Sequence, residues 1–225
     1  MASVLENLQG VKARIARAAR DAGRDPESVT LLAVSKTHSI ELIAQAHAAG
    51  QRAFGENYVQ EAIRKMDALP PLEWHLIGAL QSNKSRLAAE RFDWVQTVDR
   101  IKIAQRLSEQ RPPERPPLNV LIQVNISGEA TKSGVDVKEV TALAAAIAAL
   151  PRLRLRGLMA IPAPGARADF RKMKSLYDAL KSQHRFDTLS MGMTDDMEDA
   201  IAEGATMVRI GTAIFGQRKP EKSAA

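Results

Sequence analysis

The sequence predicts a single-domain α/β protein, a (β/α)8 TIM barrel preceded by one extra N-terminal helix. Short apolar segments alternate with helical segments along the 225 residues, and eight such alternations can be counted. The apolar segments have no polar face, as expected of parallel strands that helices cover on the outside. No fixed-period internal repeat suggests a solenoid. Eight units favour a closed barrel over an open sheet.

The predicted strands share a length of four to seven residues and a nearly continuous apolar character. We expect strands at residues 30–34, 52–55, 73–78, 94–98, 119–125, 155–161, 188–191 and 207–211.

The predicted helices show apolar residues at helical spacing and end at Gly or Pro. The first, residues 3–22, has Val4, Leu8, Val11 and Ile15 on one face. The others are expected at residues 40–49, 59–69, 82–90, 100–110, 137–150, 169–182 and 195–203. Residues 111–117, rich in Pro, are expected to form an extended surface connection. The alternation continues in phase across them, so we expect one domain over residues 1–217 and a polar tail at 218–225.

Composition excludes several function classes. The chain has no Cys, which excludes disulfide scaffolds, Cys-type zinc sites and thiol nucleophiles. No cluster has metal-ligand spacing, so no metal site is expected. No apolar run is long enough for a membrane span, and the first residues do not resemble a signal peptide, so we expect a cytoplasmic protein. The net charge of +6 suggests nucleic acid, but no binding motif or aromatic platform accompanies it.

Polar residues at the carboxyl ends of the strands are the candidate site, because function gathers there in such barrels. Lys36 follows the first strand and shares a face with Leu32 and Val34. A lysine in a low dielectric loses its preference for the charged form, which frees the amine to attack an aldehyde. A lysine that simply reaches solvent is the alternative.

The loops after the last two strands have the residues of a phosphate site. Ser190, Gly192 and Thr194 lie in one loop and Gly211 and Thr212 in the other. Glycines let a backbone approach an anion, hydroxyls donate to it, and a helix beginning near residue 195 would present N–H groups. A pair of ordinary turns is the alternative.

Arg209 favours the phosphate interpretation. It lies within an apolar strand, where a buried guanidinium is costly without a carboxylate or a ligand, and its spacing places it on the same strand face as Gly211. Lys36 at one strand end and this phosphate site several strands away would hold a phosphorylated aldehyde at two points.

Nine segments carry a resemblance to a known family. They are AVSKT (33–37), FGENYVQE (54–61), WHLIG (74–78), LQSNK (80–84), IQVN (122–125), KSG (132–134), RGLMAI (156–161), SMGMTDDM (190–197) and VRIGTAIFG (208–216). In order and spacing they resemble the pyridoxal phosphate homeostasis proteins, which are similar to the N-terminal barrel of bacterial alanine racemase. The chain departs from the family pattern near Ser39, where the family often has a proline.

The resemblance implies a role for each site residue. It implies that Lys36 carries pyridoxal 5'-phosphate (PLP) as an internal aldimine. It implies that Ser190, Gly211 and Thr212 hold the phosphate and that Arg209 faces the pyridine nitrogen. It also implies that Ser35, Asn57 and Met159 line the pocket.

The leading hypothesis is a carrier that stores or delivers PLP without robust catalysis, so no catalytic residue is assigned. A protonated arginine beside the pyridine nitrogen makes the ring a weak electron sink. In alanine racemase a second base comes from another domain and the partner subunit, for which we expect no room after this barrel. A monomeric racemase-like enzyme acting on amino acids is the alternative. PLP-dependent apo-enzymes are the expected recipients, and the chain is expected to be a monomer. His75 is expected to be a core residue, and His38 and His47 to lie at the surface.

Overall fold

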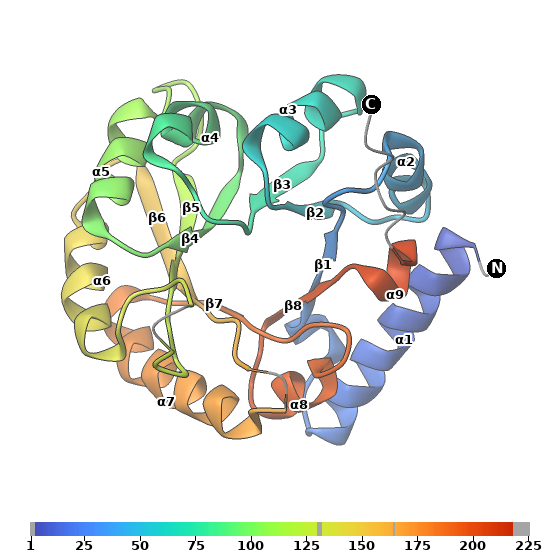
Figure 1. Ribbon diagram of the computed structural model, residues 1–225. Helices are drawn as coiled ribbons and strands as arrows, with labels where there is room; N and C mark the ends of the chain where they lie inside the picture. The colour runs from blue at the N-terminus through green and yellow to red at the C-terminus, as the bar shows by residue number, and fades with distance from the viewer. Residues whose placement is uncertain (1–2, 130–131, 164, 218–225) are drawn as a thin grey trace.

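The computed structural model describes residues 3–129, 132–163 and 165–217. Eight strands form a closed barrel in chain order, each hydrogen-bonded to the next, and β8 closes against β1. The strands surround the centre of Figure 1, and the helices form a ring outside them. The predicted barrel with its extra N-terminal helix is therefore confirmed. The predicted tail, residues 218–225, lies outside the described residues.

All eight strands are parallel to their neighbours. Their bounds are β1 Thr30–Val34, β2 Ala53–Glu56, β3 Glu73–Leu76, β4 Trp94–Val98, β5 Leu118–Gln123, β6 Leu153–Met159, β7 Thr188–Ser190 and β8 Met207–Ile210.

Each strand is followed by a helix that packs on the outside of the barrel. The helices are α1 Val4–Asp21, α2 Ile40–Ala48, α3 Val59–Ala68, α4 Ser85–Arg91, α5 Ile101–Gln110, α6 Val140–Ala148, α7 Arg167–His184, α8 Met197–Ala202 and α9 Thr212–Phe215. Short 3-10 turns η1 Pro26–Ser28, η2 Ser82–Lys84 and η3 Val137–Glu139 precede β1, α4 and α6.

The extra helix α1 begins at a capping box. The Ser3 hydroxyl accepts the Glu6 N–H, and the Glu6 carboxylate accepts the Ser3 N–H. The apolar face predicted from the sequence is buried, and the helix lies against α8 and α9 (Figure 1). Asn7 also donates to the carbonyl of Ile214, at a distance of 3.0 Å. The helix therefore supports the last two βα units of the barrel.

The core has two parts, because strand residues alternate between the two faces of the barrel wall. Leu31 and Ala33 of β1 point outward into the large core under the helices. Leu32 points inward and packs with Val34. Polar residues occupy much of the remaining interior, and among them His75, Gln96 and Ser190 are fully buried. The face of β1 that Lys36 was predicted to share with Leu32 and Val34 is thus the inner face of the barrel wall.

Three local predictions need correction. The helix expected from residue 195 begins at Met197, because the Asp196 carboxylate binds the Met193 N–H and holds residues 193–196 as a turn. The short helix α9 follows β8 and was not predicted. The segment 111–117 is not merely a surface connection, because the buried guanidinium of Arg111 donates to the carbonyls of Ala89 and Phe92.

Candidate functional site

A cavity of about 250 Å³ opens at the carboxyl ends of the strands. Five of the predicted site residues line it together: Lys36 after β1, Asn57 after β2, Arg209 in β8, and the Gly211–Thr212 pair after β8. The cavity wall also includes Thr194 from the β7–α8 loop. The β1–β8 closure explains this meeting, since Leu32 pairs with Arg209 and brings the first and last strands side by side.

Lys36 lies just beyond β1, and both of its chain neighbours are fixed by side chains of the next βα unit. The carbonyl of Ser35 accepts a hydrogen bond from the Lys65 ammonium at 2.8 Å. The N–H of Thr37 donates to the Glu61 carboxylate at 2.5 Å. Thr37 has a φ of 63°, a left-handed conformation that is unfavourable for a β-branched residue. The Glu61 contact stabilises that turn and therefore the position of Lys36.

Lys65 is the centre of this cluster, which we call the Lys65 clamp (Ser35, Thr37, Glu56, Glu61 and Lys65). Its ammonium lies 2.7 Å from Glu56 Oε1 and 2.6 Å from Glu61 Oε1. Burial raises the pKa of the Glu56 carboxyl, and the charge of Lys65 opposes that rise. The hydroxyl of Ser35 also donates to Glu56 Oε1 at 2.5 Å. The clamp therefore joins β1, β2 and α3 beneath Lys36.

Arg209 is 4% exposed and is held by neutral oxygens. It donates through Nη1 to the hydroxyl of Ser190 at 2.8 Å and through Nη2 to the carbonyl of Ala160 at 2.9 Å. Burial lowers the pKa of Arg209 to about 10, and the charge of Asp196 opposes that change. At neutral pH the side chain is a cation, and Arg209 is one of the residues that line the cavity.

Ser190 and Met159 are buried in the barrel interior. Ser190 is fully buried, and its hydroxyl donates to Gln96 Oε1 at 2.7 Å while it accepts from Arg209. Met159 is fully buried against Trp94 and Leu121 inside the barrel. Neither is among the residues that line the cavity. The alternation of side chains at the ends of β7 and β6 turns both residues inward.

Thr194 contributes to the wall of the cavity near the predicted phosphate site. Its carbonyl accepts a hydrogen bond from Arg14 of α1 at 3.2 Å, and Arg14 also forms an ion pair with Glu198. The β7–α8 loop is thus fixed from outside by the extra helix. The N–H groups at the start of α9, beside Gly211 and Thr212, have no acceptor within that helix because a first turn offers none.

Two predictions for histidines have clear outcomes. His75 is fully buried and hydrogen-bonded, as expected. His38, expected at the surface, is partly exposed at the wall of the cavity, and its ring centroid lies 5.0 Å from that of Phe215. The contact with Phe215 depends on the unpredicted helix α9, so local sequence gave no sign of it.

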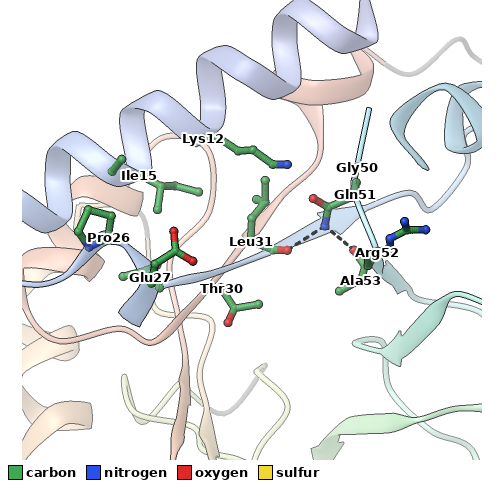
Figure 2. Close-up of a pocket in the computed structure, with 12 residues that line it drawn as sticks. Lys12, Ile15, Pro26, Glu27, Thr30, Leu31, Gly50, Gln51, Arg52 and Ala53 are labelled. Atoms are coloured by element: carbon green, nitrogen blue, oxygen red, sulfur yellow. Dashed lines mark hydrogen bonds between the residues drawn. The ribbon is translucent and has the colours of Figure 1, made fainter. Parts of the chain in front are cut away.

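A second hollow, of about 480 Å³, lies at the opposite end of the barrel between α1 and the starts of β1 and β2 (Figure 2). Gln51 borders it and donates to the carbonyls of Leu31 and Ala53 at 2.9 and 2.8 Å. These bonds join β1 to β2, which gives Gln51 a structural role. Among the described residues no group of three or more His, Asp or Glu could hold a metal ion.

Glu61, Lys65 and Gln96 were not predicted, although the sequence carries a trace of each. Glu61 and Lys65 are four apart in a predicted helix, a spacing typical of ion pairs. Gln96 is a polar residue in the middle of an apolar strand, on the same face as Trp94. Neither pattern predicts which residues of other strands these side chains contact.

Comparison with known proteins identifies the family. Residues 7–219 match the family model described as "Alanine racemase, N-terminal domain". The pyridoxal phosphate homeostasis protein of Escherichia coli (strain K12) is 57% identical over 233 residues, covering 99% of this chain and 100% of that protein. This chain belongs to the pyridoxal phosphate homeostasis protein family. The predicted family is therefore confirmed.

Solved structures agree with this membership. PipY of Synechococcus elongatus PCC7942, a structure with PLP bound, is 38% identical with a TM-score of 0.83, and the match covers 95% of this chain and 100% of PipY. Alanine racemase from Corynebacterium glutamicum is similar in fold alone, at 21% identity and a TM-score of 0.69. That match covers 94% of this chain and 61% of the racemase.

Proposed function

We propose that this homeostasis-family protein binds PLP covalently through Lys36 and stores or delivers the cofactor in the cell. The observation that carries the proposal is the meeting of Lys36, Arg209, Gly211 and Thr212 around one cavity at the strand ends. Its volume of about 250 Å³ lies just below the roughly 300–1,000 Å³ typical of small-ligand pockets. A relative of the same fold, PipY, has been solved with PLP bound.

The residues present fit this cofactor by their chemistry. PLP supplies an aldehyde that condenses reversibly with a primary amine, with loss of water. Lys36 is the amine that faces the cavity. Gly211 and Thr212 lie where backbone N–H groups and a hydroxyl would bind the phosphate. Arg209 would donate to the ring nitrogen, and Asn57 would line the pocket.

Because Ser190 is buried, we propose a supporting role for it in place of direct phosphate binding. Its hydroxyl already donates to Gln96 and accepts from Arg209, so it supports the arginine. Thr194, four residues later, lines the cavity and has a hydroxyl to offer. We therefore place Thr194 beside Gly211 and Thr212 in the phosphate site, and Ser190 and Met159 beneath it.

The test of binding is chemical labelling of Lys36. Protein mixed with PLP is reduced with borohydride and mapped by peptide mass spectrometry, and the visible absorption band is recorded before reduction. We expect the adduct on Lys36, and its loss together with the band in Lys36→Ala. Lys12→Ala, at the far end of the barrel, is the control and should behave as the wild type. An unchanged adduct and band in Lys36→Ala would contradict the proposal.

A role without robust catalysis fits the cavity better than an enzyme. Racemisation needs a base on each face of the substrate carbon. The cavity's titratable lining residues are Lys36, His38, Asp195 and Arg209, of which Lys36 and His38 come from one turn. A guanidinium at the ring nitrogen would weaken the ring as an electron sink. These features support a carrier with no catalytic residue.

A racemase-like enzyme acting on amino acids is the second candidate, favoured by the fold shared with alanine racemase. The PLP-loaded protein is incubated with L- and D-amino acids in deuterated water, and α-proton exchange is followed by NMR. Exchange no faster than with free PLP is expected of the carrier. Exchange well above that level would show the enzyme.

The same proposal extends to the protein's cellular location, oligomeric state and partners. None of the described helices combines the length and apolar character needed to cross a bilayer. We place the protein in the cytoplasm, as a monomer, with PLP-dependent apo-enzymes as recipients and without nucleic acid as a partner. Sedimentation of the loaded protein tests the monomer. Mixing it with an apo-enzyme and following the gain of that enzyme's activity tests delivery.

A further inference from the structure

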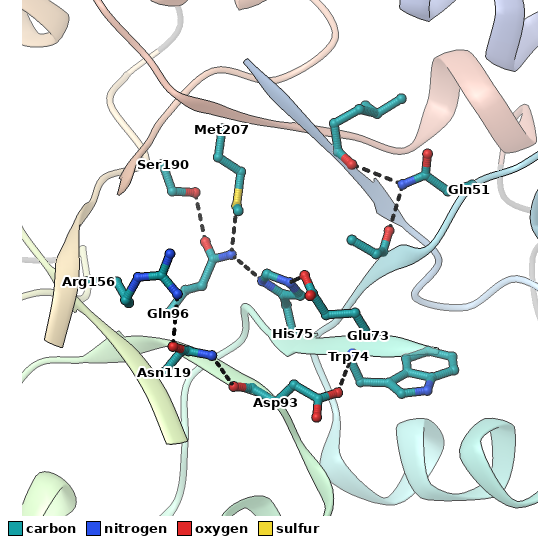
Figure 3. A network of polar contacts seen from close by, with 12 residues as sticks. Gln51, Glu73, Trp74, His75, Asp93, Gln96, Asn119, Arg156, Ser190 and Met207 are labelled. Atoms are coloured by element: carbon teal, nitrogen blue, oxygen red, sulfur yellow. Dashed lines mark hydrogen bonds and ion pairs between the residues drawn. The ribbon is translucent and has the colours of Figure 1, made fainter. Parts of the chain in front are cut away.

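A chain of hydrogen bonds crosses the interior of the barrel from Arg209 to Glu73. Arg209 Nη1 donates to the Ser190 hydroxyl at 2.8 Å, which donates to Gln96 Oε1 at 2.7 Å. Gln96 Nε2 lies 2.8 Å from His75 Nδ1, and His75 Nε2 lies 2.7 Å from Glu73 Oε1. Figure 3 shows the part from Ser190 to Glu73. The chain begins at the cavity wall and ends at the first residue of β3, at the opposite end of the barrel.

All of these hydrogen bonds run in the same donor-to-acceptor direction, from Arg209 to Glu73. The guanidinium of Arg209 can only donate, and the carboxylate of Glu73 can only accept. Ser190 and Gln96 each accept one hydrogen bond and donate the next. His75 therefore accepts at Nδ1 and donates from Nε2. Burial lowers the pKa of His75, while its bond to Glu73 opposes that change, so the ring is neutral as the chain requires. A cation at one end is thus balanced by an anion at the other through aligned dipoles.

The surroundings allow one orientation of Gln96. Its Nε2 also donates to Met207 Sδ at 3.2 Å, so the amide cannot turn over without losing contacts at both ends. The His75 ring is stacked on Trp94 with 5.0 Å between centroids and 9° between planes. The guanidinium of Arg156 covers the Trp94 ring, 4.7 Å from its centroid. The middle of the chain is therefore rigid.

The packing of the barrel does not require these polar groups. Gln96, His75 and Ser190 are each fully buried, in an interior that elsewhere is filled by Leu32, Leu121 and similar side chains. Burying polar side chains costs free energy that an apolar residue would not, even when they are hydrogen-bonded. We therefore look for a functional reason for this buried series of hydrogen-bonded side chains.

We propose that Gln96, with His75 and Glu73, is a positioning residue for Arg209. It holds the Ser190 hydroxyl as an acceptor for Nη1, and this fixes the plane in which the guanidinium presents its free N–H groups to the cavity. The inference rests on the proposed function, since the ring nitrogen of PLP is the group that Arg209 would meet. The relay keeps that nitrogen unprotonated and sets the electronic state of the bound cofactor.

The test compares the pH dependence of the cofactor's visible absorption in four proteins: wild type, Gln96→Leu, Glu73→Gln and Gln123→Leu. Gln123 is a buried glutamine of β5 outside the chain and serves as the control. In Gln96→Leu we expect the midpoint of the spectral change to move by about one pH unit, the size of one hydrogen bond to a charged group. Glu73→Gln keeps the shape of the side chain and should move the midpoint less, in the same direction.

A second readout needs no cofactor. Imidazole NMR of the free protein should show His75 protonated at Nε2, which donates to Glu73, and the resonance of Nδ1 should shift in Gln96→Leu because Nδ1 loses its donor. An unmoved midpoint and an unchanged Nδ1 resonance in Gln96→Leu would overturn the relay. If Gln96→Leu does not fold, Glu73→Gln, half-exposed at the far end, decides the question by the same two measurements. If borohydride does not label Lys36 in the wild type, the proposed function is contradicted. The NMR measurement, which needs no cofactor, then tests the relay by itself.

Discussion

Removing the ammonium of Lys65 is the sharpest test of how the protein positions Lys36. In Lys65→Met the side chain keeps its length, but the hydrogen bonds to the Ser35 carbonyl and to the carboxylates of Glu56 and Glu61 are lost. The Lys65 side chain is 6% exposed and that of Glu56 0%. The variant therefore leaves a buried carboxylate without its counter-charge.

The expected loss is about 3–5 kcal/mol in the free energy of unfolding, the usual cost of breaking a buried pair on one side. That is a large share of the roughly 5–15 kcal/mol available to a typical domain. The double variant Lys65→Met/Glu56→Gln should recover part of the loss, because no charge is then stranded. Arg17→Met removes an exposed pair with Asp21, in which the arginine side chain is 84% exposed, and should cost less than about 1 kcal/mol.

The loss should also depend on pH. Burial raises the pKa of Glu56 in the folded state above 4.5, and without Lys65 the opposing effect is gone. A carboxyl with a raised folded-state pKa favours the folded state at low pH, and this contribution is lost as the pH rises through that pKa. The deficit of Lys65→Met should therefore be smaller at pH 5 than at pH 7.5.

Urea unfolding followed by circular dichroism at both pH values measures these differences. Titration with PLP, for whichever proteins fold, then shows whether affinity falls with the clamp. A loss below about 1 kcal/mol at pH 7.5, equal to that of Arg17→Met, would refute the reasoning, because it would mean that the buried pair adds no more than an exposed one.

Two further predictions concern the barrel itself. Gly157→Ala should destabilise the protein by about 3 kcal/mol or prevent folding, because φ at residue 157 is +151° and a Cβ would lie 1.8 Å from the Thr188 carbonyl oxygen. Thermal unfolding measures the effect, and a Tm equal to that of the wild type would contradict the prediction. His75 has a lowered folded-state pKa from burial, so its contribution to stability is present above about pH 6.5 and is lost as the pH falls. Urea midpoints at pH 7.5 and 5.5 should therefore differ more in the wild type than in His75→Gln, and an equal difference in both would count against a buried neutral ring.

The sequence predicted every strand to within two residues at each end. It did so because strand and helix periodicities depend on side chains that are neighbours along the chain, and burial on both faces of a parallel strand leaves an unmistakable apolar run. The same local rule predicted that Lys36 shares a face with Val34 and that Arg209 shares a face with Gly211, and all four residues line the cavity. The helix ends were less exact: α4 begins three residues late, after a 3-10 turn, and α6 likewise.

Contacts across the barrel could not be predicted in this way. The inward turn of Ser190 and Met159 depends on where β7 and β6 end against their neighbours. The tilted ring contact of His38 depends on Phe215, at the other end of the chain. The sequence likewise gave no sign that the Ser190 hydroxyl contacts Gln96 and Arg209, whereas Thr194 lines the cavity.

The sequence by itself thus determined the barrel, the family resemblance and the strand ends at which the chemistry gathers. The tertiary structure alone decided which polar groups meet: the Lys65 clamp beneath Lys36, and the row of donors from Arg209 to Glu73. The physical reason is that periodicity fixes the face on which a side chain lies, while its partner is fixed by the register between strands far apart in the chain. That register is set only when β8 closes against β1.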